Sequence, residues 1–321
     1  MRLFLSLACA AVGWAQVLHV ADLNTRQIRE LDRDKTAVIL VGGILEQHGP
    51  YLPAFTDGYL SQGLAADLAK AIAARPGWKA LVFPQIPIGS EGFNQLGSKS
   101  IFPGTFGVRS STLQSVFMDL ASELGEQKFK WVFVVHVHGA SLHNRALDKA
   151  GDFFHDVYGG RLVHLWGMVP VIGAWGKELQ SLSEAQKKEE GVSFHAGMDE
   201  TSLMLYRKPE LVSPDHKKAP VFTGPTPEES VAVAQKDEWP GYLGSPRQGS
   251  KELGERIWNA LSASLVKHAL AILDGEDPRK HLRYSVGQAK YPIYQEMDRG
   301  ALAHEEKVAA KQAEWLAKQP K

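Results

Sequence analysis

The sequence predicts an α/β fold, a three-layer α/β/α sandwich with a mostly parallel central sheet. Runs of β-branched and apolar residues recur along the chain, and stretches with helical periodicity separate them; the runs cover residues 36–41, 79–88, 130–135 and 161–169. The first of them is continuously apolar, which is typical of a strand buried on both faces. Strands that alternate with helices of this length form parallel sheets covered by helices on both faces.

The elements follow one another in a regular order. The first strand stops at Gly42 and Gly43, and a Gly/Ser-rich loop over residues 89–105 is long enough to suggest a functional role. Helices are predicted over residues 58–74, 110–124, 142–157 and 250–273, with a further helical pattern over 299–316. The Pro- and Gly-rich segment 214–246 is interpreted as an excursion over the surface, so we predict one domain, residues 16–275, and a charged, partly helical tail, residues 276–321.

The N-terminus has the pattern of a secretory signal peptide, residues 1–15. Arg2 precedes an apolar stretch over residues 3–12, and Gly13 and Ala15 are the small residues at positions −3 and −1 of a cut after Ala15. A short buried element of the fold and a lipoprotein signal at Cys9 are the weaker alternatives. The stretch is too short to span a bilayer, so we expect a periplasmic or secreted protein without membrane association after signal cleavage.

Composition restricts the classes of partner. Among 321 residues, 44% are hydrophobic and 22% charged, and 36 basic residues balance 36 acidic ones. No basic cluster stands out, so neither nucleic acid nor a charged membrane surface is an expected partner. The expected partner is a small-molecule substrate. The only cysteine, Cys9, lies in the predicted signal peptide, so the mature chain would contain no thiol nucleophile or thiolate ligand.

Three potential metal ligands follow the first strand within twelve residues. Glu46 and His48 are two apart, so in an extended chain both side chains leave the same side of the backbone. Asp57 reaches them only if the intervening Gly- and Pro-containing loop folds back. The alternatives are a solvated loop for the first two residues and a helix N-cap for Asp57.

Two further clusters follow later elements. His136 and His138 end the third strand, where one or both can face a site, because ligands bind outside the carboxyl ends of strands in open α/β sheets. His195 begins a second cluster, residues 195–202, and can exchange a proton near neutral pH. Acids in the first turn of a helix, such as Glu200, also have a purely structural explanation.

Together these motifs resemble the creatininase (creatinine amidohydrolase) family. Five ordered motifs between residues 22 and 273 carry the resemblance. They are the metal motif at residues 46–57, the Pro-Gly-Thr loop at 102–105, a counterpart of His-Gly-Gly-Asn at 138–141, the His-Ala-Gly and Glu-Thr-Ser motif at 195–202, and the Gly-x-Pro segment at 244–256.

The resemblance implies a three-layer fold and a site for two divalent metal ions, zinc at both positions or manganese or iron at one. Glu46 and His138 would bind one ion, His48 the other, and Asp57 would bridge them. His195 would protonate or orient the substrate, and we predict Glu200 as a second catalytic residue.

The donor set agrees with this assignment. Oxygen and imidazole ligands without thiolate suit Zn, Mn or Fe, and two ions roughly 3.5–4 Å apart can hold a bridging hydroxide. That hydroxide would attack an amide carbon while His195 protonates the departing nitrogen. The sequence therefore predicts an enzyme, a metal-dependent hydrolase of carbon–nitrogen bonds that cleaves an amide or lactam in a non-peptide or small-peptide substrate.

The chain also departs from the family pattern. Creatinine-hydrolysing members carry a Glu ligand where this sequence has Ala140, and Ser141 stands in place of the Asn of the common motif. We therefore predict Glu200 as the replacement metal ligand and do not expect creatinine to be the substrate. Weaker candidates for lining the pocket are Ser90, Glu91, Trp166 and Trp175.

Two other classes of function stay open. A catalytically impaired metal- or ligand-binding protein on the same fold would explain Ala140 and Ser141. A structural protein could use the C-terminal helix to wrap a neighbouring subunit. The resemblance itself implies a homo-oligomer, with a hexamer as the expected form.

Overall fold

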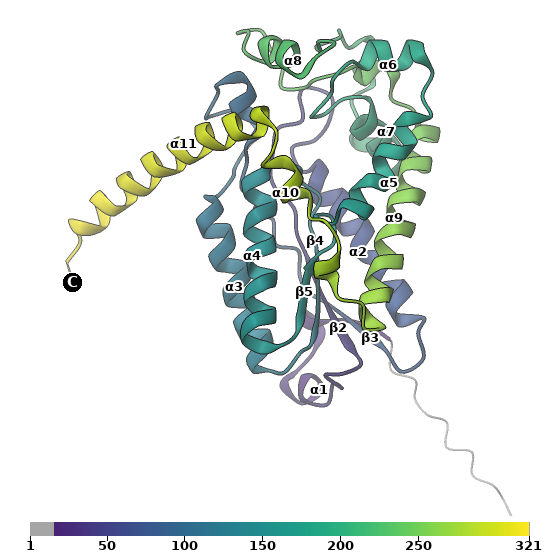
Figure 1. Ribbon diagram of the computed structural model, residues 1–321, viewed down its shortest axis with the longest axis vertical. Helices are drawn as coiled ribbons and strands as arrows, with labels where there is room; N and C mark the ends of the chain where they lie inside the picture. Colours follow the sequence, from purple (N-terminus) through teal and green to yellow (C-terminus); the bar gives the residue numbers. More distant parts are fainter. Residues whose placement is uncertain (1–15, 321) are drawn as a thin grey trace, which may run out of the picture.

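A computed structural model describes residues 16–320, in which a five-stranded sheet lies between two layers of helices (Figure 1). The strand order is β1-β3-β2-β4-β5, and all neighbouring strands are parallel. The strands are β1 (Val17–His19), β2 (Thr36–Val41), β3 (Lys79–Val82), β4 (Trp131–Val135) and β5 (Arg161–His164). The predicted three-layer fold with its parallel sheet is confirmed; the predicted signal peptide, residues 1–15, lies outside the described residues.

Four long helices cover the two faces of the sheet, as Figure 1 shows. They are α2 (Thr56–Ala73) and α9 (Lys251–Leu273) on one face, and α3 (Ser110–Glu126) and α4 (Ser141–Tyr158) on the other. The predicted alternation of strands and helices is therefore confirmed, and each of these four helices agrees with its predicted range within two residues at either end.

The two faces of β2 belong to two separate apolar clusters. Ile39 and Val41 pack in the cluster that contains α2 and α9, whereas Val38 and Leu40 pack in the one that contains α3 and α4. Successive side chains of a strand point to opposite faces, so a strand covered on both sides must be apolar throughout. All six residues of β2 are buried, as the continuous apolar run predicts.

The strands differ from the prediction at their ends. The sequence analysis missed β1, whose three residues at the edge of the sheet are too few to show a period. The strand predicted over residues 79–88 ends at Val82, because Pro84 and Pro87 cannot donate to a ladder. The strand predicted over residues 161–169 ends at His164, and α5 begins shortly after it.

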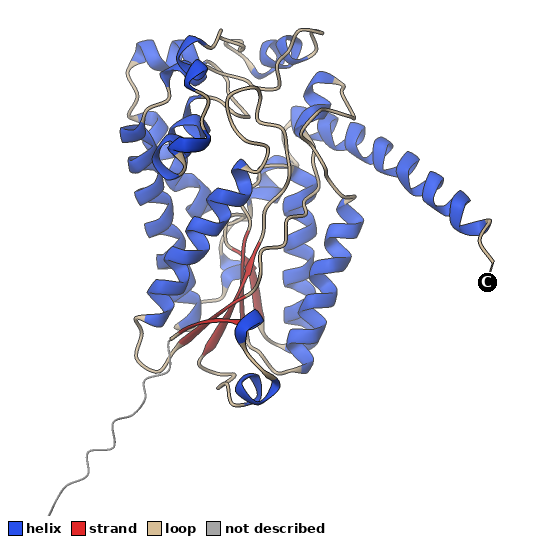
Figure 2. Cartoon of the chain, turned by 180° about the vertical axis from the view of Figure 1, so that it is seen from behind, coloured by secondary structure: helices blue, strands red, loops and turns tan. Residues whose placement is uncertain are grey.

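The remaining helices lie mainly beyond the carboxyl ends of the strands (Figures 1 and 2). They are α5 (Val169–Gln180), α6 (Glu184–Glu190), α7 (Met198–Arg207) and α8 (Pro227–Ala234), while α1 (Thr25–Arg29) lies at the opposite end. Short 3-10 helices cover Val20–Asp22, Phe93–Gly97, Pro209–Leu211, Pro214–Lys218, Pro246–Gln248 and Pro278–Lys280.

The segment 214–246 is more ordered than predicted, because it contains α8. Thr226 caps this helix: its hydroxyl accepts the Glu229 N–H at 3.2 Å, and the Glu229 carboxylate accepts the Thr226 N–H at 3.2 Å. This reciprocal pair is a capping box, and Pro227 supplies a favourable first helical residue. The residues of this capping box can be read in the sequence, but the many Pro and Gly residues around them favoured the prediction of an irregular segment.

Two helices form the C-terminal tail, α10 (Tyr284–Gln288) and α11 (Pro292–Ala317). The helix predicted over residues 299–316 thus begins earlier, with Pro292 in its first turn. Met297 and Ala301 are buried against the body, whereas the later turns project away from it toward the C-terminus (Figures 1 and 2). Within residues 16–320, no helix has the length and apolar character needed to cross a bilayer.

Candidate metal centre

Six buried or half-buried side chains that the sequence analysis singled out converge at the carboxyl end of the sheet. They are Glu46 and His48 after β2, Asp57 in the first turn of α2, His138 after β4, and His195 and Glu200 before and within α7. The edge of the sheet brings them together because β2 and β4 are parallel neighbours.

The first group of ligand atoms belongs to Glu46, Asp57 and His138, all within 4.8 Å of one another. His138 Nδ1 lies 3.0 Å from Glu46 Oε2 and 3.0 Å from Asp57 Oδ2. Its Nε2 lies 3.1 Å from the carbonyl oxygen of Ser90, which can only accept, so the proton is on Nε2. That bond leaves the Nδ1 lone pair available to a metal ion.

The second group belongs to His48, Asp57 and Glu200. His48 Nδ1 donates to the carbonyl oxygen of Glu46 at 2.9 Å, which leaves Nε2 as the free nitrogen. That Nε2 lies 3.4 Å from Asp57 Oδ1 and 3.9 Å from Glu200 Oε1. Asp57 thus turns Oδ2 to the first group and Oδ1 to the second, which is the arrangement of a bridging carboxylate.

Asp57 is not a helix cap. The helix begins at Thr56, two residues earlier than predicted, and its N-cap position is Phe55. The carboxylate of Asp57 instead contacts the two imidazoles, while its place in the first turn still benefits from the helix dipole.

The charges of the site favour a bound cation. Burial lowers the pKa of His48, but the nearby carboxylate of Asp57, with those of Glu200 and Glu46, outweighs it and raises the pKa to about 10. His138 likewise has its pKa raised well above the usual value, against burial, by Glu46 and Asp57. Without an ion, protons on the two imidazoles balance the carboxylates; a divalent ion would replace those protons.

Buried polar atoms without a hydrogen-bond partner give an independent test of whether these residues fit a metal ion. Among the described residues, buried Glu46 Oε1 and His48 Nε2 have no hydrogen-bond partner. Leaving such groups unpaired is costly, and a metal ion would satisfy both. The donors are carboxylate oxygens and imidazole nitrogens, which suit Zn, Mn or Fe. The residues present therefore fit a metal centre.

His195 lies beside both groups. Its Nε2 donates to the carbonyl oxygen of Gln47, and its ring stacks on Phe93 with centroids 5.3 Å apart and an interplanar angle of 12°. The ring centroid is 4.4 Å from that of His48, and a ring nitrogen lies within 4.8 Å of ligand atoms of Glu46 and His48. This position fits the predicted proton-handling role, and it is also close enough for a ligand.

Glu200 is directed by the turn that precedes α7. The Ala196 N–H donates to Glu200 Oε2, which leaves Oε1 facing His48. Ala196 has a φ of 52°, a left-handed conformation that is strained for a residue with a side chain. A Cβ on Gly197 would lie 2.3 Å from Glu190 Oε1, so only glycine fits there. The His-Ala-Gly sequence therefore shapes the turn that aims Glu200.

Ala140 is not among the residues that line the cavity beside the centre. Its side chain is buried in an apolar cluster with Phe93, Leu96 and Met297. Among the two candidates at the end of β4, His138 is the one that joins the centre. His136 instead contacts the Ile88 carbonyl oxygen at 3.0 Å, and burial is the main cause that lowers its pKa to about 3.

A cavity of about 400 Å³ adjoins the candidate metal centre. Its aromatic lining consists of Phe93, Trp166, Trp175, Phe194, Tyr284 and Tyr294. The two tryptophans agree with the weaker sequence predictions, whereas Glu91 lines a neighbouring cavity under α11 and Ser90 acts through its carbonyl oxygen. The sequence analysis missed Tyr284 and Tyr294, because the tail that carries them has no local motif.

The sequence matches the family profile described as "Creatininase: Creatinine amidohydrolase" over residues 21–269. The chain belongs to the creatininase family. It is 29% identical over 248 residues to the mycofactocin precursor peptide peptidase of Mycolicibacterium smegmatis, covering 75% of this chain and 88% of that protein. It is 28% identical over 236 residues to the creatinine amidohydrolase of Pseudomonas putida, covering 68% and 83%.

Solved structures agree on the fold of this creatininase-family chain. The structure titled "Creatininase Mn" superposes with a TM-score of 0.59 at 22% identity, over 80% of this chain and 99% of that chain. The prediction of an enzyme is confirmed at the level of the family: the chain belongs to a family whose members are metal-dependent amidohydrolases acting on carbon–nitrogen bonds. The family match ends at residue 269, so the tail with Tyr284 and Tyr294 lies beyond it.

Proposed function

We propose that this chain hydrolyses a carbon–nitrogen bond in a small peptide or peptide-like amide and uses two divalent metal ions. The observation that carries the proposal is Asp57, whose two oxygens face two separate groups of ligand atoms. A peptide-like substrate is supported by the roomy aromatic cavity of about 400 Å³ and by similarity to a mycofactocin precursor peptide peptidase. Ala140 argues against creatinine.

The proposed ligands divide between the two groups. Glu46, Asp57 and His138 would hold one ion, and His48, Asp57 and Glu200 the other. Zinc fits both positions, and manganese or iron fits one of them. When bound, such ions polarise a carbonyl oxygen and make a coordinated water nucleophilic near neutral pH.

The protein's own groups supply the proton transfers in this proposal. His195 is held by the Gln47 carbonyl and the face of Phe93, so its ring is oriented beside the ligands and protonates the departing nitrogen. Glu200 lines the cavity and has a side chain that is 16% exposed, so it is placed to accept a proton from the attacking water. Aromatic side chains line the cavity beside both groups.

Metal analysis combined with a substrate panel tests the proposal. Protein purified without chelator should contain about two equivalents of a transition metal and release amine from N-acyl amino-acid amides. Stripped protein that regains turnover after metal is added back is the matched control. Less than about 0.5 equivalent after supplementation would refute the metal centre. Full occupancy without hydrolysis of any amide or lactam would favour the impaired binding protein.

Export and assembly are separate proposals. Residues 1–15 support a periplasmic or secreted mature chain, and the family resemblance supports a homo-oligomer, with a hexamer as the expected form. Mass spectrometry of protein from the periplasmic fraction should show a chain that begins at Gln16. Sedimentation of the same material would give the assembled mass, and a monomer would contradict the second proposal.

A further inference from the structure

The tail returns to the candidate metal centre after it leaves the matched family region. Tyr284 of α10 and Tyr294 of α11 line the same cavity as Glu46, Asp57 and His138. From the sequence, residues 276–321 were predicted to form a charged, partly helical tail. The described part of that segment instead contributes a wall to the site.

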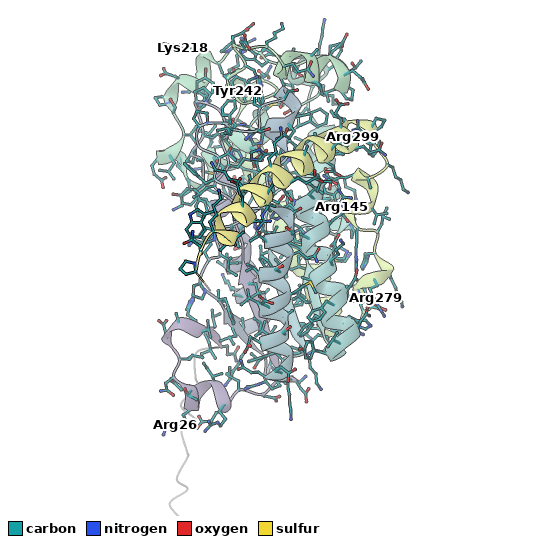
Figure 3. The ribbon with its side chains drawn as sticks, turned by 90° about the vertical axis from the view of Figure 1, so that its left-hand side faces the viewer. Arg26, Arg145, Lys218, Tyr242, Arg279 and Arg299 are labelled. Atoms are coloured by element: carbon teal, nitrogen blue, oxygen red, sulfur yellow. The ribbon has the colours of Figure 1, made fainter. Side chains whose placement is uncertain are left out.

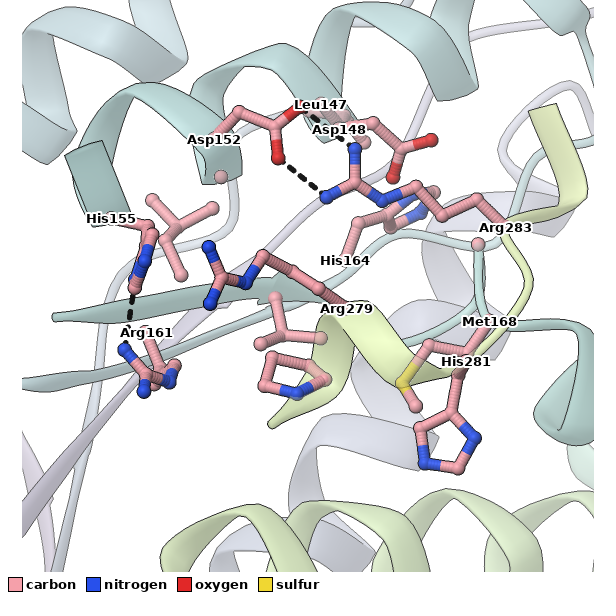
Figure 4. A pocket seen from close by; sticks show the side chains of 15 residues that line it. Leu147, Asp148, Asp152, His155, Arg161, His164, Met168, Arg279, His281 and Arg283 are labelled. Atoms are coloured by element: carbon pink, nitrogen blue, oxygen red, sulfur yellow. Dashed lines mark hydrogen bonds and ion pairs between the residues drawn. The ribbon is translucent and has the colours of Figure 1, made fainter. Parts of the chain in front are cut away.

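The start of the tail is fixed along the end of β5 and on α4. The Tyr284 N–H donates to the Gly167 carbonyl oxygen at 2.7 Å, and Arg283 forms an antiparallel bridge with Met168. The Arg283 guanidinium pairs with Asp152 of α4 at 2.8 Å, as Figure 4 shows. Backbone hydrogen bonding and a side-chain ion pair therefore both fix the position of Tyr284.

Further anchors lie close to the metal ligands. The Gln288 side chain donates to the carbonyl oxygen of Gly139, next to His138, and accepts from Asn144 Nδ2 at 3.1 Å. Asp298 of α11 pairs with Arg145 of α4, which lies close to α11 in Figure 3. Tyr294 lies between these two anchors in the sequence, so its ring is also held against the body.

The two tyrosine hydroxyl groups form a pair. Their oxygens are 3.2 Å apart, so one hydroxyl donates to the other. Whichever one donates, one hydroxyl hydrogen remains for a ligand. Burial is the main cause that raises the pKa of Tyr284 far above its usual range, so the phenol stays neutral and keeps its proton. The complementary group on a ligand for such a neutral hydroxyl donor is a carbonyl oxygen, which accepts the hydrogen bond.

We infer that Tyr284 and Tyr294 determine substrate specificity by hydrogen bonding to a second carbonyl group beside the scissile amide. The substrate class is then an N-acylated amino-acid amide or short peptide, whose repeating amides supply that carbonyl. The inference rests on the proposed function, which it deepens. A simple amide without the second carbonyl would leave the hydroxyl pair without its partner and bind less tightly.

Two amides that differ in one group provide the test. N-acetylphenylalaninamide carries the second carbonyl, and 3-phenylpropanamide has the same phenylalkyl amide without the acetamido group. Binding to the metal-loaded full-length enzyme is measured by calorimetry, and ammonia release is measured separately. The variants are Tyr284→Phe, Tyr294→Phe and the double variant. Tyr291→Phe is the matched control, since Tyr291 belongs to the same segment and is 62% exposed.

We expect wild type and Tyr291→Phe to prefer N-acetylphenylalaninamide about ten-fold, the effect of one hydrogen bond in a desolvated site. The double variant should lose most of that preference in Kd and KM and each single variant at least part of it, with kcat and metal content within about two-fold. An unchanged preference in the double variant, or wild-type enzyme that binds both amides equally or neither, overturns the inference. Wild-type enzyme that binds with this preference and releases no ammonia refutes the proposed function instead.

Discussion

The candidate metal centre has two halves, which are the two groups of ligand atoms, and they differ in compactness and in exposure to solvent. In the half formed by Glu46, Asp57 and His138, the side chains are 1 to 3% exposed and two donor pairs are 3.0 Å apart. In the other half, Asp57 and Glu200 lie 3.4 and 3.9 Å from His48 Nε2, and the Glu200 side chain is 16% exposed. The first half is compact and almost fully buried, whereas the second is wider and more exposed at Glu200; residues of both halves line the substrate cavity.

This difference follows from how the chain supplies each half. Glu46, Asp57 and His138 come from segments attached to β2 and β4, the two neighbouring central strands. Glu200 comes from α7, behind a turn with a left-handed alanine. Structural metal sites are closed, and catalytic ones keep a position open to water or substrate. We therefore expect the first half to hold its ion more tightly and the second to hold the ion that meets substrate.

The largest effect is expected from Asp57→Asn, because Asp57 belongs to both halves. Both ions should be lost, and kcat/KM should fall about 10,000-fold, since each ion supplies several kcal/mol of transition-state stabilisation. Metal content and amide hydrolysis are measured together. Asp119→Asn on the exposed face of α3 is the control. Retention of one full equivalent would show that Asp57 does not bridge the halves.

His195→Ala tests whether His195 is a metal ligand or a neighbouring residue that transfers a proton. We expect kcat to fall about 1,000-fold with both ions retained, as for the loss of a general acid. The ring contacts Phe93 and the Gln47 carbonyl, and neither contact requires an ion. Metal content and kcat are again the measurements. Loss of one equivalent would make His195 a ligand, and full turnover would remove its proton-transfer role.

The same division explains what the sequence could predict. Three ligands could be predicted from local pattern: Glu46 of the compact half and His48 of the wider half are two residues apart after an apolar strand, and the parallel sheet places His138 of the compact half at the same edge. Sequence alone left Asp57 open between cap and ligand, because a helix boundary two residues earlier decides it. Glu200 was predicted as the replacement ligand, and the structure places it in the second half.

The part of the cavity wall that Tyr284 and Tyr294 form could not be predicted from local sequence patterns. Tyr284 and Tyr294 are fixed by contacts with residues more than a hundred positions away, such as Asp152 and Gly139, through Arg283 and Gln288. Such contacts leave no periodicity or spacing in the sequence. Their contribution to the cavity became visible only once the chain was folded.

Glu200→Gln should affect the wider half alone. Changes around a metal ligand cost 10- to 100-fold in affinity, so we expect the second ion to bind about 100-fold more weakly while the first stays bound. Metal added in excess should therefore restore occupancy of the second position, which Asp57→Asn does not allow. Glu184→Gln, whose side chain is 92% exposed on α6, is the control. Equal loss of both ions would contradict the inequality of the halves.

The smallest effect on metal binding is expected from Ala140→Glu, which adds the carboxylate that creatinine-hydrolysing relatives carry. Ala140 is buried with Phe93, Leu96 and Met297, so the new carboxylate would have to enter a cluster of apolar side chains. We expect less than about two-fold change in affinity for the second ion and a loss of about 3 kcal/mol in stability, measured by metal titration and thermal unfolding. Ala140→Gln, which has nearly the same volume and no charge, separates the steric cost from the charge. Tighter binding of the second ion without loss of stability would mean that position 140 still faces the wider half, and that Glu200 has not replaced the missing ligand.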